Sequence, residues 1–428
     1  PSDVVGPGAQ GNDVAATTNF QRATADYRYT PSKNVKNRTK FALGRDAIDF
    51  SAFDLFRLQF DGSSAEQRNT TTGSFNPNLS IEAGIDTTGG YFDGRVNAPP
   101  ISREGEAEGE FDPDDLIFAK VDGYLLAFAT YIEAQVKFGK LSLTPGLRFD
   151  YFAKVNELSA DPRIVARYDF DDRWAIKGGA AVVHQEPQIP DLSDEFGNPD
   201  LSLQRAYQYS LGGEWKPFEF LKADLTFFYK DLKDMVSASN RVIERNGEMV
   251  PEVLNNGGEG RVYGLETFIE HKFANNFRGW LSYTLSRAER TDFGSDESRL
   301  FDFDQTHILA IVASYTLPRN WELGLRWRLV TGSPFTPAIG GVFVDKIDEY
   351  APLYGAPNSD RLPMFQSLDL RVDKTWVYDT WKLGAYLSLI NSYNNGNVES
   401  VNYNFDYTEE GYVYGLPILP ILGVKGEW

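Results

Sequence analysis

Large apolar residues occupy every second position in many stretches of this sequence. Between residues 321 and 329 they alternate with charged residues or glycine, in the order Trp321, Glu322, Leu323, Gly324, Leu325, Arg326, Trp327, Arg328 and Leu329. The same two-residue period recurs in residues 221–230 and along most of the chain. Successive side chains of an extended strand point to opposite faces. Each stretch therefore predicts a β-strand with apolar surroundings on one face and water on the other.

From residue 120 onward, short turns and long polar segments alternate between these stretches. The short connections fall at residues 139–140, 171–173, 216–219, 274–276, 318–320 and 378–380. The long ones span residues 186–205, 235–260, 288–304, 333–364 and 394–413. Short periplasmic turns and long extracellular loops are typical of outer-membrane barrels. We therefore predict an all-β fold, a transmembrane antiparallel β-barrel of the bacterial outer membrane. A soluble β-sandwich with aromatic residues near its turns is the alternative.

Aromatic residues flank nearly every short connection. The set comprises Phe138, Phe170, Trp174, Trp215, Phe218, Phe273, Phe277, Trp321, Trp376, Trp381 and Trp428. In a barrel these residues would lie at one height and form an aromatic girdle at one membrane interface. Trp428 also completes an alternating series over residues 416–428, and an aromatic residue at the end of an amphipathic strand resembles the last strand of such barrels.

Composition and missing motifs argue against several other classes of protein. No run of about 18 apolar residues occurs, which excludes a transmembrane helix. A net charge of -19 argues against nucleic-acid binding, and the absence of cysteine argues against a disulfide framework or a cysteine metal site. His184, His271 and His307 lack metal-ligand spacing. The nucleophile-elbow, Walker and zinc-protease motifs are absent. We expect no enzymatic activity and no resident cofactor, with hydrolysis at the barrel mouth as the alternative.

Charged residues collect in two places where a ligand could be captured. The expected outer loops carry Glu186, Asp191, Asp194 and Glu195, which are interpreted either as solvated loop residues or as oxygen ligands for a divalent cation. Alternation places Arg148, Asp150, Arg326, Arg328, Asp369, Arg371 and Asp373 on the inward face. Such charges would line water or bond to material inside the barrel. The candidate ligand-binding residues are therefore Glu186, Asp191, Asp194, Glu195, Arg326, Arg328, Asp369 and Arg371, and no catalytic or metal residue is assigned.

Several short motifs occur in a fixed order over residues 124–428. An Asn-Pro-x-Leu loop at residues 198–201 is followed by a Tyr-x-x-Gly strand at residues 209–212 and by a Phe-x-x-Asp-x-x-Asp strand end at residues 228–234. Residues 256–266, 303–307, 331–337 and 389–394 continue the series. In this order and spacing, the chain resembles the barrels of TonB-dependent outer-membrane receptors.

The resemblance implies active import of a ligand through a plugged barrel, driven from the periplasm by a TonB-type energising protein. A transporter of this type has about 22 strands. The sequence predicts about thirteen strands after residue 120 and four or five before it. We expect a flexible segment or loop at residues 1–18, early strands and long loops at residues 19–119, and C-terminal barrel strands at residues 120–428. The plug domain is not found in this chain.

The expected partners are the lipid bilayer, a plug domain or second chain supplying the missing N-terminal strands, the energising protein through that part, and an unidentified substrate. Two other functions stay open at this point. One is a passive porin-like diffusion channel, in which inward charges set ion selectivity. The other is a receptor or secretion conduit that binds a protein at its acidic loops.

Overall fold

Strands account for nearly all of the regular structure in the computed structural model. The structure describes residues 14–52, 56–98, 117–193, 197–239, 241–245, 247–345 and 348–428. Within these ranges the helical elements are the single-turn 3-10 helices η2 (Pro190–Leu192) and η3 (Pro318–Asn320). Nowhere in the described part of the chain is a helix long and apolar enough to cross a membrane.

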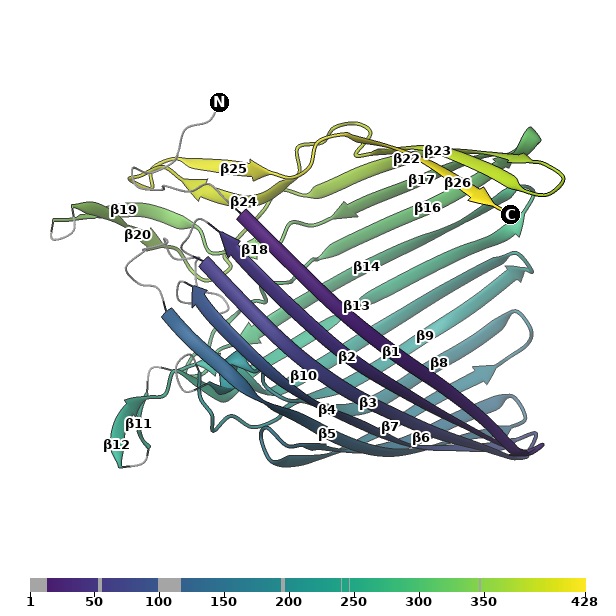
Figure 1. Cartoon of the computed structure of the whole chain (residues 1–428), viewed down its shortest axis with the longest axis horizontal. Coiled ribbons are helices and arrows are strands. Elements are labelled where there is room, and N and C mark those ends of the chain that lie inside the picture. The colour runs from purple at the N-terminus through teal and green to yellow at the C-terminus, as the bar shows by residue number, and fades with distance from the viewer. Residues whose placement is uncertain are drawn as a thin grey trace.

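An 18-stranded sheet forms the body of the molecule (Figure 1). Its long strands pair antiparallel with their neighbours in chain order. They are β1 (Val14–Ser32), β2 (Val35–Ala52), β3 (Phe56–Asn76), β4 (Leu79–Ala98), β5 (Ile117–Phe138), β6 (Leu141–Phe152), β7 (Glu157–Asp169), β8 (Trp174–Gln185), β9 (Gln204–Phe218), β10 (Leu221–Ala238), β13 (Leu254–Ala274), β14 (Phe277–Thr291), β16 (His307–Leu317), β17 (Trp321–Val330), β22 (Phe365–Val377), β23 (Lys382–Ile390) and β26 (Leu419–Glu427). The remaining member, β15 (Ser298–Leu300), pairs with the end of β14. The predicted all-β antiparallel fold is confirmed.

The two edge strands of this sheet run in the same direction. Without β15, seventeen strands follow one another, and the even number of antiparallel steps between them leaves β1 and β26 parallel. Among the described residues no hydrogen-bonded pairing joins β1 to β26. An antiparallel closure therefore needs an odd number of further strands between the two edges.

Short turns lie at one end of the strands and long connections at the other (Figure 1). The short turns use residues that tolerate a left-handed backbone: Asn275 and Asn276 have φ of 53° and 64°, and Gly139 has φ of 60°. Two-residue turns of this kind match the twist of the strands that they join. The long connections carry small hairpins of their own, formed by β11 (Val242–Arg245) with β12 (Glu248–Pro251), β19 (Ala338–Val344) with β20 (Glu349–Tyr354), and β24 (Val398–Tyr403) with β25 (Glu410–Tyr414).

The two faces of the sheet differ as the alternation predicts. On β17 the side of Trp321, Leu323 and Leu325 is apolar, and these residues are 42%, 42% and 37% exposed. The opposite side carries Glu322 and Arg326, which pair with charged residues of other strands. We refer to the first side as the outward face and to the second as the lumen face.

The early strands follow this rule less closely. Phe56, Leu58 and Phe60 of β3 lie in an unbroken register with Arg68, whose guanidinium pairs with Asp86 on the lumen face. The apolar row of this segment therefore faces the lumen. The outward row of β3 instead carries polar residues, including Gln67, Asn69 and Thr71. Polar residues on both faces leave the sequence pattern without a unique facing for this strand.

The strand boundaries refine the expected division of the chain. β1 begins at Val14, so residues 14–18 belong to a strand and not to the expected loop, whereas residues 1–13 lie outside the described part. Val14 pairs with Ala52 at the end of β2, so the length of β2 accounts for the early start of β1. Four of the long strands precede residue 117 and thirteen begin at or after it. The connection between β4 and β5, residues 99–116, falls outside the described residues.

Candidate functional site

The acidic loop candidates lie in the connection between β8 and β9. Glu186 follows β8 directly and Asp191 belongs to η2, while Asp194 and Glu195 fall outside the described residues. The backbone N–H of Gln188 donates to Asp191 Oδ2 over 3.1 Å. Burial raises the pKa of both the Glu186 and the Asp191 carboxyl, and Lys154 offsets part of that rise at Glu186. Both groups therefore lose their protons less readily than an open carboxyl does.

The lumen candidates form a single cluster on the adjacent strands β17 and β22. Arg326 and Asp369 are directly opposite each other, and Arg326 Nε donates to Asp369 Oδ2 over 2.7 Å. Asp369, only 7% exposed, also accepts from the Ser367 hydroxyl at 2.7 Å and from the Asn391 N–H at 3.0 Å. This carboxylate is satisfied by the protein and serves to fix Arg326 in place.

The two remaining arginines of the cluster rest on aromatic rings. The Arg328 guanidinium carbon lies 5.1 Å from the Phe365 ring centre, and that of Arg371 lies 3.8 Å from the Tyr386 ring centre. Arg371 also pairs with Asp373, with Nη2 2.7 Å from Oδ1. The Nε of Arg328 is buried and has no hydrogen-bond partner among the described residues. No hydrogen bond or ion pair in the described part of the chain joins this cluster to Glu186 or Asp191.

Paired charges continue along the lumen face far beyond this cluster. Arg148, expected inward together with Asp150, pairs with that residue at 2.8 Å and with Asp86 at 2.9 Å. Sequence reasoning did not single out Asp86, because the pairing depends on the register of β4 against β5 and β6. The only signal for it in the sequence was its place in the same alternating row.

Glu214 on β9 is another lumen charge that sequence reasoning missed. It is only 5% exposed and has three cationic partners: Arg167 at 2.9 Å, Lys216 at 2.9 Å and Lys222 at 2.8 Å. A carboxylate so enclosed is stable in its charged form only with such partners. The lumen face is thus a polar surface of matched charges that can hydrate or hydrogen-bond to material inside the sheet.

The motif residues between strands act as structural ties at the bases of the long connections. Asp304 is 1% exposed, accepts a hydrogen bond from the Ala288 N–H at 2.6 Å and pairs with Arg361. A Cβ added at Gly332 would lie 1.8 Å from the Leu362 carbonyl oxygen, so only glycine fits this close backbone approach. These ties fasten the connections on either side of β16 and β17.

Two asparagine side chains also fasten connections to strand ends, around β9, β10 and β13. The Asn198 side-chain amide donates to the Leu254 carbonyl oxygen at 2.8 Å. The Asn256 amide donates to the carbonyl oxygens of Ser202 at 3.1 Å and Asp234 at 2.9 Å. These bonds tie the connection between β8 and β9 to the outer ends of β10 and β13.

The predicted girdle residues lie beside the short turns, and all but Phe277 are exposed. Trp174 and Trp215 stack across β8 and β9 with ring centres 5.4 Å apart. Lys374 Nζ lies 5.4 Å from the Trp321 ring centre and 5.7 Å from that of Trp376. The exposed members of the predicted set are Phe138, Phe170, Trp174, Trp215, Phe218, Phe273, Trp321, Trp376, Trp381 and Trp428, whereas Phe277 is partly covered and contacts His271.

Metal-ligating side chains do not gather in the described ranges of the chain. No group of three or more histidine or acidic residues there is close enough together to hold a metal ion. Asp194 and Glu195 lie outside these ranges, so divalent-cation binding at the acidic loops stays a prediction.

Comparison with known proteins places this fold in a family. The sequence profile described as TonB dependent receptor-like, beta-barrel, matches residues 2–414. An iron-regulated outer membrane virulence protein of Vibrio cholerae is 25% identical over 145 residues, which make up 30% of this chain and 22% of that protein.

Solved structures with the same fold include two iron-related receptors. The ferric-catecholate import receptor Fiu of E. coli K12 superposes with a TM-score of 0.68 at 13% identity, over 96% of this chain and 64% of that one. The pyoverdine outer membrane receptor FpvA of Pseudomonas aeruginosa PAO1, bound to pyoverdine, gives a TM-score of 0.70 at 12% identity, over 96% and 62%. The chain therefore spans less than two thirds of the length of these structures.

Proposed function

The chain belongs to the family of TonB-dependent receptor-like β-barrels of the outer membrane, and on that premise we propose that it forms the wall of an active importer. The observation that carries the proposal is the family match over residues 2–414 together with a lumen face of paired charges. This is a family of receptors and transporters, and we propose no catalytic role for the chain.

A plug and further strands are the partners that such a wall requires. Every unpaired N–H and C=O of an edge strand in lipid costs several kcal/mol. β1 contributes an edge of 19 residues, and β26 runs parallel to it. We propose that an odd number of strands, about five if the total is the 22 of plugged transporters, completes the sheet. The segment that supplies them, upstream or on a second chain, also supplies the plug and the contact with the energising protein.

The lumen cluster on β17 and β22 is the proposed ligand-facing part of the wall. Arg326 is held by Asp369 through Nε and Nη2, and its side chain is 48% exposed, so part of the guanidinium group faces the lumen. Arg328 offers a buried Nε without a partner among the described residues. Arginines of this kind suit an anionic ligand. The relatives named for ferric catecholate and for pyoverdine favour a ferric chelate as the ligand class.

Uptake in living cells tests the proposal. Cells carrying the complete gene should accumulate a radiolabelled ferric chelate, and deletion of the energising protein should abolish that accumulation. An Arg326→Gln, Arg328→Gln double variant should reduce uptake while surface levels stay unchanged. Lys425→Gln, which removes a charge paired with Glu427 at the turn end, provides the matched control. Uptake that persists without the energising protein would contradict active import and support a diffusion channel.

A further inference from the structure

A hollow on the outward face of β10, β13 and β14 has an apolar floor and, at the end nearer the long connections, charged residues. It has a volume of about 760 Å³, and its floor includes Phe227, Leu265 and Leu285. These three residues are in register across the strands: Phe227 is opposite Leu265, and Leu265 is opposite Leu285. They share the outward parity of Leu225, which is 41% exposed. The hollow therefore opens toward lipid and not toward the lumen.

Two arginines close the end of this hollow that is nearer the long connections. Arg261 Nε and Arg287 Nε each lie 2.6 Å from a different carboxylate oxygen of Glu289. The Glu289 side chain is 10% exposed, whereas those of Arg261 and Arg287 are 53% and 49% exposed. One enclosed carboxylate thus fixes two guanidinium groups side by side. Their terminal Nη nitrogens have no hydrogen-bond partner among the described residues.

The two arginines lie at the height expected for the interface on the side of the membrane that carries the long connections. Arg287 follows the turn residue Asn276 by eleven positions, and a strand rising about 3.4 Å per residue with a tilt of about 45° covers roughly 25 Å over that length. The apolar band of an outer-membrane barrel is also about 25 Å tall. Tyr229 and Tyr263, which line the hollow beside the arginines, are typical of residues at such an interface.

We propose that this hollow is a binding site for a phosphate-bearing lipid of the outer leaflet. An acyl chain lies over Phe227, Leu265 and Leu285, and the phosphate accepts hydrogen bonds from the free Nη groups of Arg261 and Arg287. Guanidinium groups bind phosphate oxygens through parallel N–H donors. Arg261, Arg287 and Glu289 together carry a net charge of about +1, and the neighbouring Lys233 is paired with Asp231 and Glu259. The preference for a phosphate therefore rests on the two adjacent guanidinium groups and their free Nη donors.

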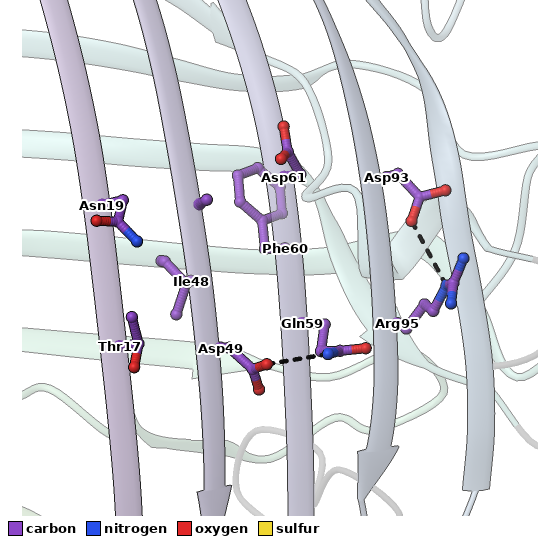
Figure 2. Close-up of a pocket in the computed structure, with 10 residues that line it drawn as sticks. Thr17, Asn19, Ile48, Asp49, Gln59, Phe60, Asp61, Asp93 and Arg95 are labelled. Carbon is purple, nitrogen blue, oxygen red and sulfur yellow. Dashed lines mark hydrogen bonds and ion pairs between the residues drawn. The ribbon is translucent and has the colours of Figure 1, made fainter.

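A second hollow on the outward face arranges its charged residues differently. The hollow at the outer ends of β1 to β4 is lined by Asp49, Asp61 and Asp93 with Arg95 (Figure 2). There Asp49 accepts from Gln59 at 3.0 Å and Arg95 lies 3.6 Å from Asp93 (Figure 2). Arg57 pairs with Asp49, Arg45 with Asp61 and Lys120 with Asp93. Among the described residues, no carboxylate of this hollow holds two guanidinium groups side by side, so the hollow provides a matched control on the same face.

Native mass spectrometry of the purified protein in nanodiscs tests the proposal. The probe is lipid A carrying both phosphates, mixed into phosphatidylcholine, with fully dephosphorylated lipid A as its comparison. We expect the wild type to retain one lipid A molecule and the Arg261→Gln, Arg287→Gln double variant to retain at least about tenfold less. Arg95→Gln should retain as much as the wild type.

The folding of each variant is checked by its heat-dependent gel mobility, and uptake of the transported ligand is measured in parallel. Equal retention by the double variant and the wild type would overturn the proposal, as would equal retention of dephosphorylated lipid A. If the double variant fails to fold, Arg287→Lys keeps the charge but removes the parallel donors, and undiminished retention by that variant would count against the clamp. Loss of lipid binding with unchanged uptake would leave the transport proposal intact.

Discussion

Leu325 is the position at which the facing of the wall can be tested most sharply. It lies on the outward row of β17, opposite Ala313 of β16 and Leu370 of β22. It lies four positions after the girdle residue Trp321, which places it about 10 Å above the turn-side interface and near the middle of a band about 25 Å tall. An arginine at the midplane costs about 2–4 kcal/mol.

Leu325→Arg should therefore lower the ratio of folded to unfolded protein by roughly 30-fold to 800-fold. The assay is denaturant titration of refolding into phospholipid vesicles, with urea midpoints compared at equal m-values. Thr284→Arg is the matched control, because it puts the same group on the lumen row opposite Glu266. That variant should shift the free energy of unfolding by less than about 1 kcal/mol. If Leu325→Arg and Thr284→Arg are equally stable, or if Thr284→Arg is the less stable, the facing is wrong.

Three other perturbations test the loop bases. Asp304→Ala removes the enclosed carboxylate that pairs with Arg361 and should destabilise the connections by roughly 3 kcal/mol. Hydrogen exchange at residues 288–306 should then be faster, whereas Asp296→Ala, at an exposed position, should leave it unchanged. Equally slow exchange in both variants would contradict the role of the Asp304–Arg361 pair. Gly332→Ala should shift the backbone at Leu362 and make the β17–β22 connection more sensitive to protease. Gly89→Ala, where a Cβ meets no other atom, should not change the sensitivity. Equal cleavage of the two variants would refute the close approach of Gly332 to the Leu362 carbonyl. The raised pKa of Asp191 favours the ordered connection at low pH, and this contribution is lost as pH rises from the usual carboxyl value through the raised one. After correction for the intrinsic pH dependence of amide exchange, the protection of residues 187–193 should therefore fall more over that window in the wild type than in Asp191→Asn, which leaves only the contribution of Glu186; an equal fall in both would argue against it.

The strands, and which of their ends carry short turns or long connections, could be predicted from the sequence because both depend on local features. A two-residue period and a turn such as Asn275-Asn276 are properties of neighbouring residues. The facing of β17 follows from its own ten residues. β3 has polar residues on both faces, so its facing emerged only from the register with β4, where Arg68 is opposite Asp86.

The charged contacts of the wall could be predicted only in part. Alternation placed Arg326, Asp369 and Arg371 inward, but their pairing required the alignment of β17 with β22 across a connection of more than thirty residues. Glu214 and Asp304 were not assigned roles for the same reason, because their partners come from other strands or connections. The Arg261, Glu289 and Arg287 clamp depends on register and on strand tilt, neither of which a local pattern reveals.

Conductance of the native particle tests most directly whether this wall belongs to a plugged importer. The particle should be purified from outer membranes with every chain that accompanies it and inserted into a planar bilayer at physiological salt. A wall filled by a plug predicts no steady open channel, with ion flow appearing only after denaturant loosens the material in the lumen. A stable, large single-channel conductance in the untreated particle would show an open lumen and contradict the account.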